Sequence, residues 1–166
     1  GKIVAEARIL FSDKEAEKQY MEMVAAQRKM DGDFLKMLPA ENVATLAGSM
    51  DGTRTYEMLQ KIPMYSMVFA MAPQVKPIME AIDGDIALSF HGMTDNGRMP
   101  ELSLIAELKD PAIMETIKGM IPVPMQEMAP GQYALSPDAN TTIYFGLNDN
   151  TFYATTDSDA LVFLTG

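Results

Sequence analysis

Apolar and polar residues alternate along residues 86–108 in the pattern of two neighbouring strands. In residues 86–91, Ile, Leu and Phe alternate with Ala, Ser and His, which is the period of a half-buried strand. Asp95-Asn96-Gly97 follows, and successive residues that tolerate positive φ are a strong hairpin signal. The return strand places Leu and Ala on one face and Ser103, Ile105 and Glu107 on the other. The pattern predicts an antiparallel hairpin with one covered apolar face and one open, more polar face.

A helix is predicted directly after this hairpin. Asp110 is a suitable N-cap, and Pro111 fits the first helical position because its missing amide hydrogen is not needed there. The next apolar residues recur at helical spacing, at Ile113, Met114, Ile117 and Ile121. We expect this helix to cover the apolar face of the hairpin.

The same order of strand, aspartate and helix occurs elsewhere in the chain. A strand over residues 43–50 ends at Asp51, and a helical stripe follows as far as Pro63. The spacing from Asp51 to Pro63 equals that from Asp110 to Pro122, and a truncated third copy follows residues 153–155. Two interpretations remain open: a repeat with units 34–82, 83–131 and 132–166, or a chance match of common motifs.

The remaining pattern completes the picture of an α+β domain. Residues 2–11 alternate as a strand, and Ser12 with Glu15 forms a capping box for a helix that runs towards residue 31. We predict further helices over 64–72 and 74–82, a loop over 122–131, and strands over 132–135, 142–147 and 151–155. The whole chain, 1–166, is expected to be a single α+β domain, or a fragment of a larger multi-repeat protein. Its antiparallel sheet would carry amphipathic helices packed on one face.

Composition narrows the classes of function. The 166 residues include 48% hydrophobic residues and carry a net charge of −10, which predicts a folded chain and disfavours nucleic-acid binding. There is no cysteine, so disulfides and thiolate chemistry are excluded. The longest apolar run, residues 62–73, is shorter than the ~20 residues of a membrane span. No phosphate-binding glycine motif is present, and we expect no cofactor.

Sixteen methionines stand out in a chain without tryptophan. Met64, Met67 and Met71 lie at helical spacing, which is compatible with an adaptable binding face. The favoured interpretation is that methionine fills gaps in the core.

Four residues of the open sheet face are candidate ligand-binding residues: Ser89, His91, Ser103 and Glu107. His91 is the only histidine, and the chain has neither the Gly-x-Ser-x-Gly motif that presents a nucleophile nor the spaced ligands of a zinc site. Turns rich in Asp and Asn offer calcium ligands, but such residues also dominate turns for local reasons, so we expect no metal. These observations predict a non-enzymatic domain that binds or assembles, and the alternative is a hydrolase with a carboxylate- or His91-based site.

Two segments carry a family resemblance. Residues 34–43, Phe-Leu-Lys-Met-Leu-Pro-Ala-Glu-Asn-Val, and residues 104–110, Leu-Ile-Ala-Glu-Leu-Lys-Asp, resemble large secreted or lipid-anchored Bacteroidetes proteins of unknown function. In that pattern a Pro-x-Asp/Glu segment precedes a strand and an amphipathic helix, and this chain has Glu41 where Asp is commoner. The resemblance implies a lipid-anchored domain in the cell envelope. Its partners would be other parts of the same full-length protein or an envelope ligand.

Overall fold

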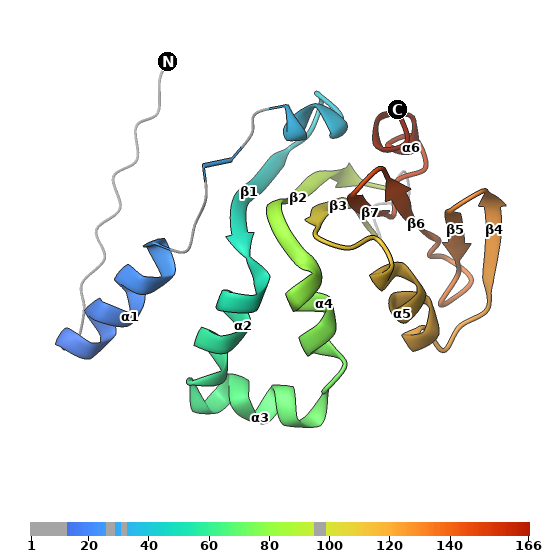
Figure 1. Ribbon diagram of the computed structural model, residues 1–166. Helices are drawn as coiled ribbons and strands as arrows, with labels where there is room; N and C mark the ends of the chain where they lie inside the picture. Colours follow the sequence, from blue (N-terminus) through green and yellow to red (C-terminus); the bar gives the residue numbers. More distant parts are fainter. Residues whose placement is uncertain (1–12, 26–28, 31–32, 95–98) are drawn as a thin grey trace, which may run out of the picture.

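The computed structural model describes residues 13–25, 29–30, 33–94 and 99–166. These residues contain a seven-stranded antiparallel sheet (Figure 1). The strand order is β1-β2-β3-β7-β6-β5-β4. The strands are β1 (Ala44–Asp51), β2 (Ile82–Met93), β3 (Pro100–Leu108), β4 (Met125–Ala129), β5 (Gln132–Leu135), β6 (Ile143–Asn148) and β7 (Thr151–Thr155). The helices are α1 (Lys14–Ala25), the 3-10 helix η1 (Phe34–Met37), α2 (Gly52–Gln60), α3 (Pro63–Met71), α4 (Val75–Ala81), α5 (Ile113–Met120) and α6 (Leu161–Leu164). The α+β class is confirmed.

Most strands and helices form where the sequence pattern predicts them, within a few residues. Three predictions involve residues outside the described ranges: the strand over 2–11, the capping box of Ser12 with Glu15, and the turn at Asp95-Asn96-Gly97. The predicted loop over 122–131 is wrong, because Met125–Ala129 forms the edge strand β4 and turns into β5 at Gly131, where φ is +76°. Prolines at both ends of this segment are typical of a loop, but the short strand lies between them.

The two aspartates singled out in the sequence, Asp51 and Asp110, are each followed by a helix, and so is Asp157 in the truncated third copy. The side chain of Asp51 accepts a hydrogen bond from the amide of Arg54 at 3.0 Å, at the start of α2. Asp110 accepts one from the amide of Ala112 at 2.9 Å, just before α5. Asp157 accepts one from the amide of Asp159 at 2.9 Å, before α6. The strand–aspartate–helix order is therefore real, whereas the division into units 34–82, 83–131 and 132–166 stays a prediction.

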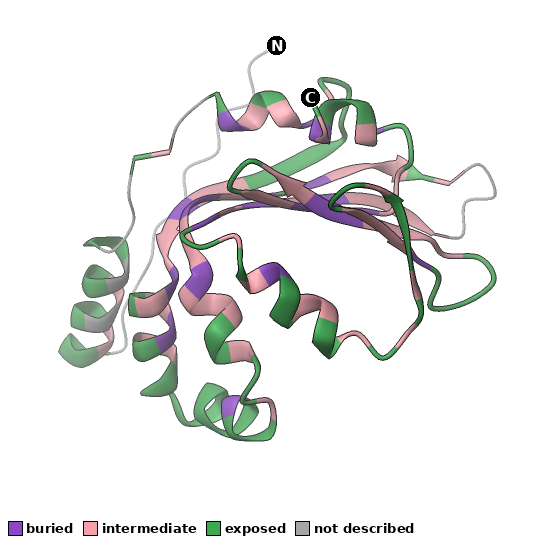
Figure 2. Cartoon of the chain, turned by 45° about the vertical axis from the view of Figure 1, so that its right-hand side comes forward, coloured by how far each residue is buried: buried purple, intermediate pink, exposed green. Residues whose placement is uncertain are grey.

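Helices pack on both faces of the sheet, not on one as expected (Figure 2). On one face, Ala87, Ile105 and Tyr153 form a cross-strand row under η1 and α6, and they are buried with Phe34, Leu38, Ala160 and Leu164. On the other face, Met114 of α5 packs against Leu135 and Phe145. Since each face has its own apolar cluster, the sheet lies between two layers of helix.

The sheet face that carries Ser89 and Ser103 was expected to be open, but η1 and α6 cover it. Ser89 and Ser103, which are cross-strand partners, are both 0% exposed, and Ile105, two residues after Ser103 on the same face, is also fully buried. The hairpin carries apolar residues on both faces, and the alternation alone did not reveal that η1 and α6 would cover the more polar one. The opposite face, which was expected to be covered, leaves Leu88 45% exposed.

Three helices form a protrusion from one end of the sheet (Figure 1). β1 leads into α2 and α4 leads back into β2, so α2, α3 and α4 connect two paired strands. α2 packs against α4, and α3 lies across their far ends. The ring of Phe69 in α3 lies 4.6 Å from that of Tyr56 in α2, and this contact packs α3 against α2.

Candidate functional site

A row of hydroxyl groups crosses the sheet beside the buried apolar row. Thr45, Ser89, Ser103 and Thr155 are successive cross-strand partners on β1, β2, β3 and β7. The hydroxyls of Thr45 and Ser89 are 2.9 Å apart, and those of Ser103 and Thr155 are 2.8 Å apart. Thr155 also donates to the carbonyl of Leu102 at 3.0 Å. Paired hydroxyls of this kind satisfy one another when helices bury them.

His91 joins this row through its Nε2 atom, which lies 2.9 Å from the Ser103 hydroxyl. A serine beside a histidine is the arrangement that activates a nucleophile, provided that the serine reaches the substrate. Ser103 has no exposed surface, and its hydroxyl already interacts with Thr155. The His91–Ser103 pair is therefore built for packing, and it gives no support to a serine-based hydrolase.

A cleft of about 510 Å³ lies beside His91. It is bounded by the segment that follows η1, by β2 and β3, and by the turn into α6. Its lining residues are Pro39, Ala40, Glu41, His91, Glu101, Asp157, Asp159, Ala160 and Phe163. Four carboxyl side chains in this set make the cleft acidic, which favours cationic over anionic ligands. Within the described residues, no three His, Cys, Asp or Glu side chains are grouped so that they could hold a metal ion.

Glu107 lies away from the other candidate residues. It belongs to the opposite end of β3, and its Oε2 atom accepts a hydrogen bond from the amide of Asp85 at 2.8 Å. Gly84 makes this contact possible, because a Cβ atom there would overlap the Glu107 carboxylate. The structure thus brings His91 and Ser103 together, places Ser89 beside them in the same row, and gives Glu107 a separate structural role.

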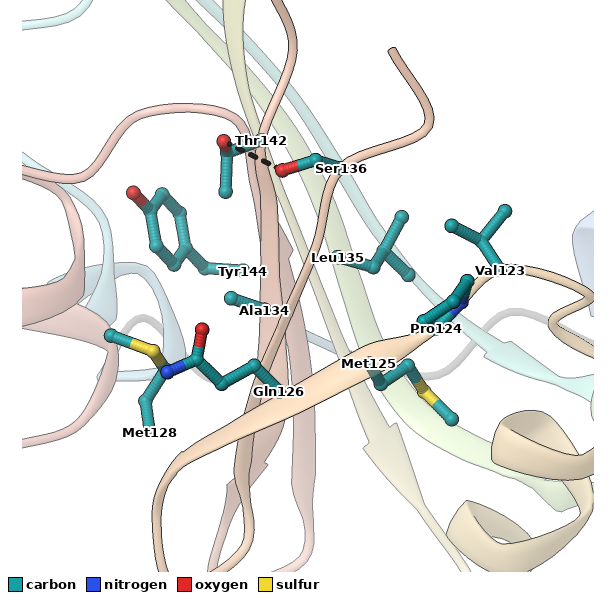
Figure 3. Close-up of a pocket in the computed structure, with 10 residues that line it drawn as sticks. All are labelled: Val123, Pro124, Met125, Gln126, Met128, Ala134, Leu135, Ser136, Thr142 and Tyr144. Carbon is teal, nitrogen blue, oxygen red and sulfur yellow. Dashed lines mark hydrogen bonds between the residues drawn. The ribbon is translucent and has the colours of Figure 1, made fainter. Parts of the chain in front are cut away.

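A second hollow lies over β4, β5 and β6 (Figure 3). Its volume is about 490 Å³, and none of its lining residues is charged. Those residues are Val123, Pro124, Met125, Gln126, Met128, Ala134, Leu135, Ser136, Thr142 and Tyr144. Tyr144 continues the hydroxyl row as the cross-strand partner of Thr155, while Ser136 and Thr142 are joined by a 3.2 Å hydrogen bond.

The β1–β2 apolar face consists of Ala44, Leu46, Leu88 and Phe90, which are cross-strand neighbours on the side of the sheet that carries α5. Leu46 is 77% exposed. The helix after Asp110, which is α5, was expected to cover this face. It packs instead over β5, β6 and β7. Sequence reasoning therefore missed this surface, although the alternation of residues 44–50 and 86–90 contains the signal for it.

Two side chains with a raised pKa, Lys118 and Tyr153, contribute to packing. The carboxylate of Glu115, 2.6 Å from Lys118 Nζ, and the hydroxyl of Tyr133 raise the pKa of Lys118. The Lys118 Nζ atom also lies 4.7 Å from the centroid of the Tyr133 ring, and this contact holds α5 against β5. Burial raises the pKa of Tyr153, whose hydroxyl has no hydrogen-bond partner among the described residues.

The chain belongs to a family described as a domain of unknown function (DUF4836). The family model matches residues 1–162, nearly the whole chain. Comparison with curated proteins found no significant match, and comparison with solved structures found none either. Within the described part of the chain, no helix combines the length and hydropathy needed to cross a bilayer.

Proposed function

We propose that this chain is a non-enzymatic binding or assembly domain of the cell envelope. The observation that carries the proposal is the β1–β2 apolar face, where Leu46 and Leu88 are cross-strand partners and both remain exposed. Exposed apolar surface that continues over neighbouring strands is characteristic of an interaction site. The envelope location rests on the resemblance of residues 34–43 and 104–110 to secreted or lipid-anchored proteins.

The partner of this face is an extended segment of the same full-length protein. β1 is an edge strand, and its eight residues, Ala44–Asp51, pair only with β2 among the described residues. An unpaired edge beside an apolar face is suited to strand addition, in which main-chain hydrogen bonds hold the partner and side chains fill the adjoining surface. An edge this long that carries apolar residues is an aggregation hazard when nothing covers it.

Single cysteines test the proposal, since residues 1–166 contain no cysteine of their own. We compare Leu46→Cys with Val162→Cys on α6, because the two original side chains are 77% and 74% exposed. The reagent is a charged maleimide that does not cross the cytoplasmic membrane, applied first to intact cells and then to the purified domain. We expect Val162→Cys to react in both cases, and Leu46→Cys to react only in the purified domain.

Each variant tests one part of the proposal. If Leu46→Cys reacts as fast as Val162→Cys in intact cells, the β1–β2 apolar face has no partner there. If neither variant reacts in intact cells but both react after lysis, the envelope location is wrong.

A further inference from the structure

The helix α3 exposes a cluster of large apolar side chains at the far end of the protrusion (Figure 1). Met67 is 67% exposed and Met71 is 81% exposed, and the other exposed members of the cluster are Met64, Tyr65 and Val68. Only Phe69 of this helix is buried. Met64, Met67 and Met71 therefore face outward. The expectation that methionine fills gaps in the core is wrong for these three residues.

The charge around this cluster differs from that of the rest of the protein. Residues 58–79 contain no acidic residue, although the chain has 23 of them. The only charged residues in this stretch are Lys61 and Lys76, which flank α3 on its two sides. In a chain with a net charge of −10, the tip of the protrusion is thus uncharged at its centre and basic at its border.

Both lysines are available for a new partner. Lys76 Nζ lies 3.8 Å from Glu80 Oε1 and 6.0 Å from the centroid of the Tyr56 ring. Its ion pair is exposed, and such pairs contribute little free energy. Lys61 lines a hollow between α1 and the end of α2 that also includes Glu22, without a hydrogen bond or ion pair to it among the described residues.

We propose that the tip formed by α3, Lys61 and Lys76 docks on the surface of an anionic lipid bilayer. Methionine, valine and tyrosine side chains enter the boundary between headgroups and acyl chains, and the two lysines meet lipid phosphates. The position of the tip supports a bilayer as its partner. The tip projects away from the sheet, and α3 lies at the far end of the protrusion, where it would meet a flat surface first (Figure 1). A second copy of the chain is a poorer partner, since the same two lysines would then approach each other. The tip is distinct from the β1–β2 apolar face, so either proposal can fail alone.

Co-sedimentation with vesicles tests the proposal. Vesicles made of equal parts of phosphatidylcholine and phosphatidylglycerol should bind the domain, and added salt should weaken the binding. The double variant Met67→Glu/Met71→Glu should lower the partition coefficient by at least roughly tenfold, because it places two charges in the apolar boundary. Lys76→Gln should lower it by about fivefold, which is the effect of removing one lysine near an anionic surface.

The matched control is Val162→Glu on α6, which makes the same kind of change at an apolar side chain that is 74% exposed and belongs to neither proposed surface. It should leave vesicle binding unchanged. Since Met67 and Met71 are exposed, their variants should retain the wild-type melting temperature, and Lys76→Gln gives a second test if they do not. The proposal is overturned if the wild type does not bind these vesicles, or if Val162→Glu weakens binding as much as the methionine variants. Light scattering that shows a dimer lost only in Met67→Glu/Met71→Glu, without vesicle binding, would instead assign α3 to a second copy.

Discussion

Replacing Gly52 with alanine is expected to destabilise the domain by about 3 kcal/mol, a large effect for one methyl group. A Cβ atom at this position would lie 1.7 Å from the carbonyl oxygen of Met79 and 2.7 Å from that of Ile82. Both atoms belong to the backbone, so no side chain can rotate to relieve the overlap. Alanine would therefore force α2 away from the end of α4, at the base of the protrusion.

Urea denaturation with wild type and a matched glycine variant measures this effect. The control is Gly119→Ala in α5, where a Cβ atom meets nothing within 4 Å. That change should stabilise the domain by roughly 0.4–1 kcal/mol, because alanine restricts the unfolded chain. If Gly52→Ala were as stable as wild type, the close approach of α2 and α4 would be wrong.

The second large effect is expected at the C-terminal helix. Leu164 has no exposed surface and belongs to the apolar cluster under η1 and α6. Leu164→Ala should reduce the free energy of unfolding by about 2–5 kcal/mol, because it removes buried methyl groups and leaves a cavity. A loss this large from a four-residue helix would show that α6 is part of the core.

The neighbouring residue Val162 provides the comparison in the same helix. Val162 points to solvent, so Val162→Ala should change the stability by less than about 0.5 kcal/mol. Equal, small effects at both positions in chemical denaturation would mean that α6 does not pack on the sheet.

Local signals in the sequence predict most of the secondary structure, because they act over a few neighbouring residues. The strands at 132–135 and 151–155 were predicted at their observed bounds, since each is a short apolar segment between turn residues. The Asp51 side chain caps α2, whereas Asp110 and Asp157 accept hydrogen bonds from amides in the turns before α5 and α6, whose N-cap residues are Ala112 and Ala160. Only β4, enclosed by prolines, escaped this kind of reasoning.

The choice of covered face could not be predicted, because it depends on segments distant in sequence. Both faces of the hairpin carry apolar residues, and the sequence does not say which helix reaches which face. η1 precedes the hairpin by more than forty residues and α6 follows it by more than fifty, yet both cover the same face. Ser89 and Ser103 are tolerated there because hydroxyls of neighbouring strands pair with them.

The candidate site was predicted in part for the same reason. Strand pairing brings His91 to Ser103, and the hairpin pattern placed both on one face. Register alone does not show that Glu107, two positions beyond Ile105, bonds to the Asp85 amide instead. The acidic residues of the cleft come from three separate segments, so no local motif joins them.

Adjacent residues on β2 provide the most direct test of which sheet face is open. In the purified domain, Leu88→Cys should react readily with a maleimide, because Leu88 is exposed on the β1–β2 apolar face. Ser89→Cys should react only at the rate of unfolding, since η1 and α6 bury that position. The reverse order, with a reactive Ser89→Cys and a protected Leu88→Cys, would mean that the face with Ser89 and His91 is the exposed one. That result would contradict the proposed interaction surface.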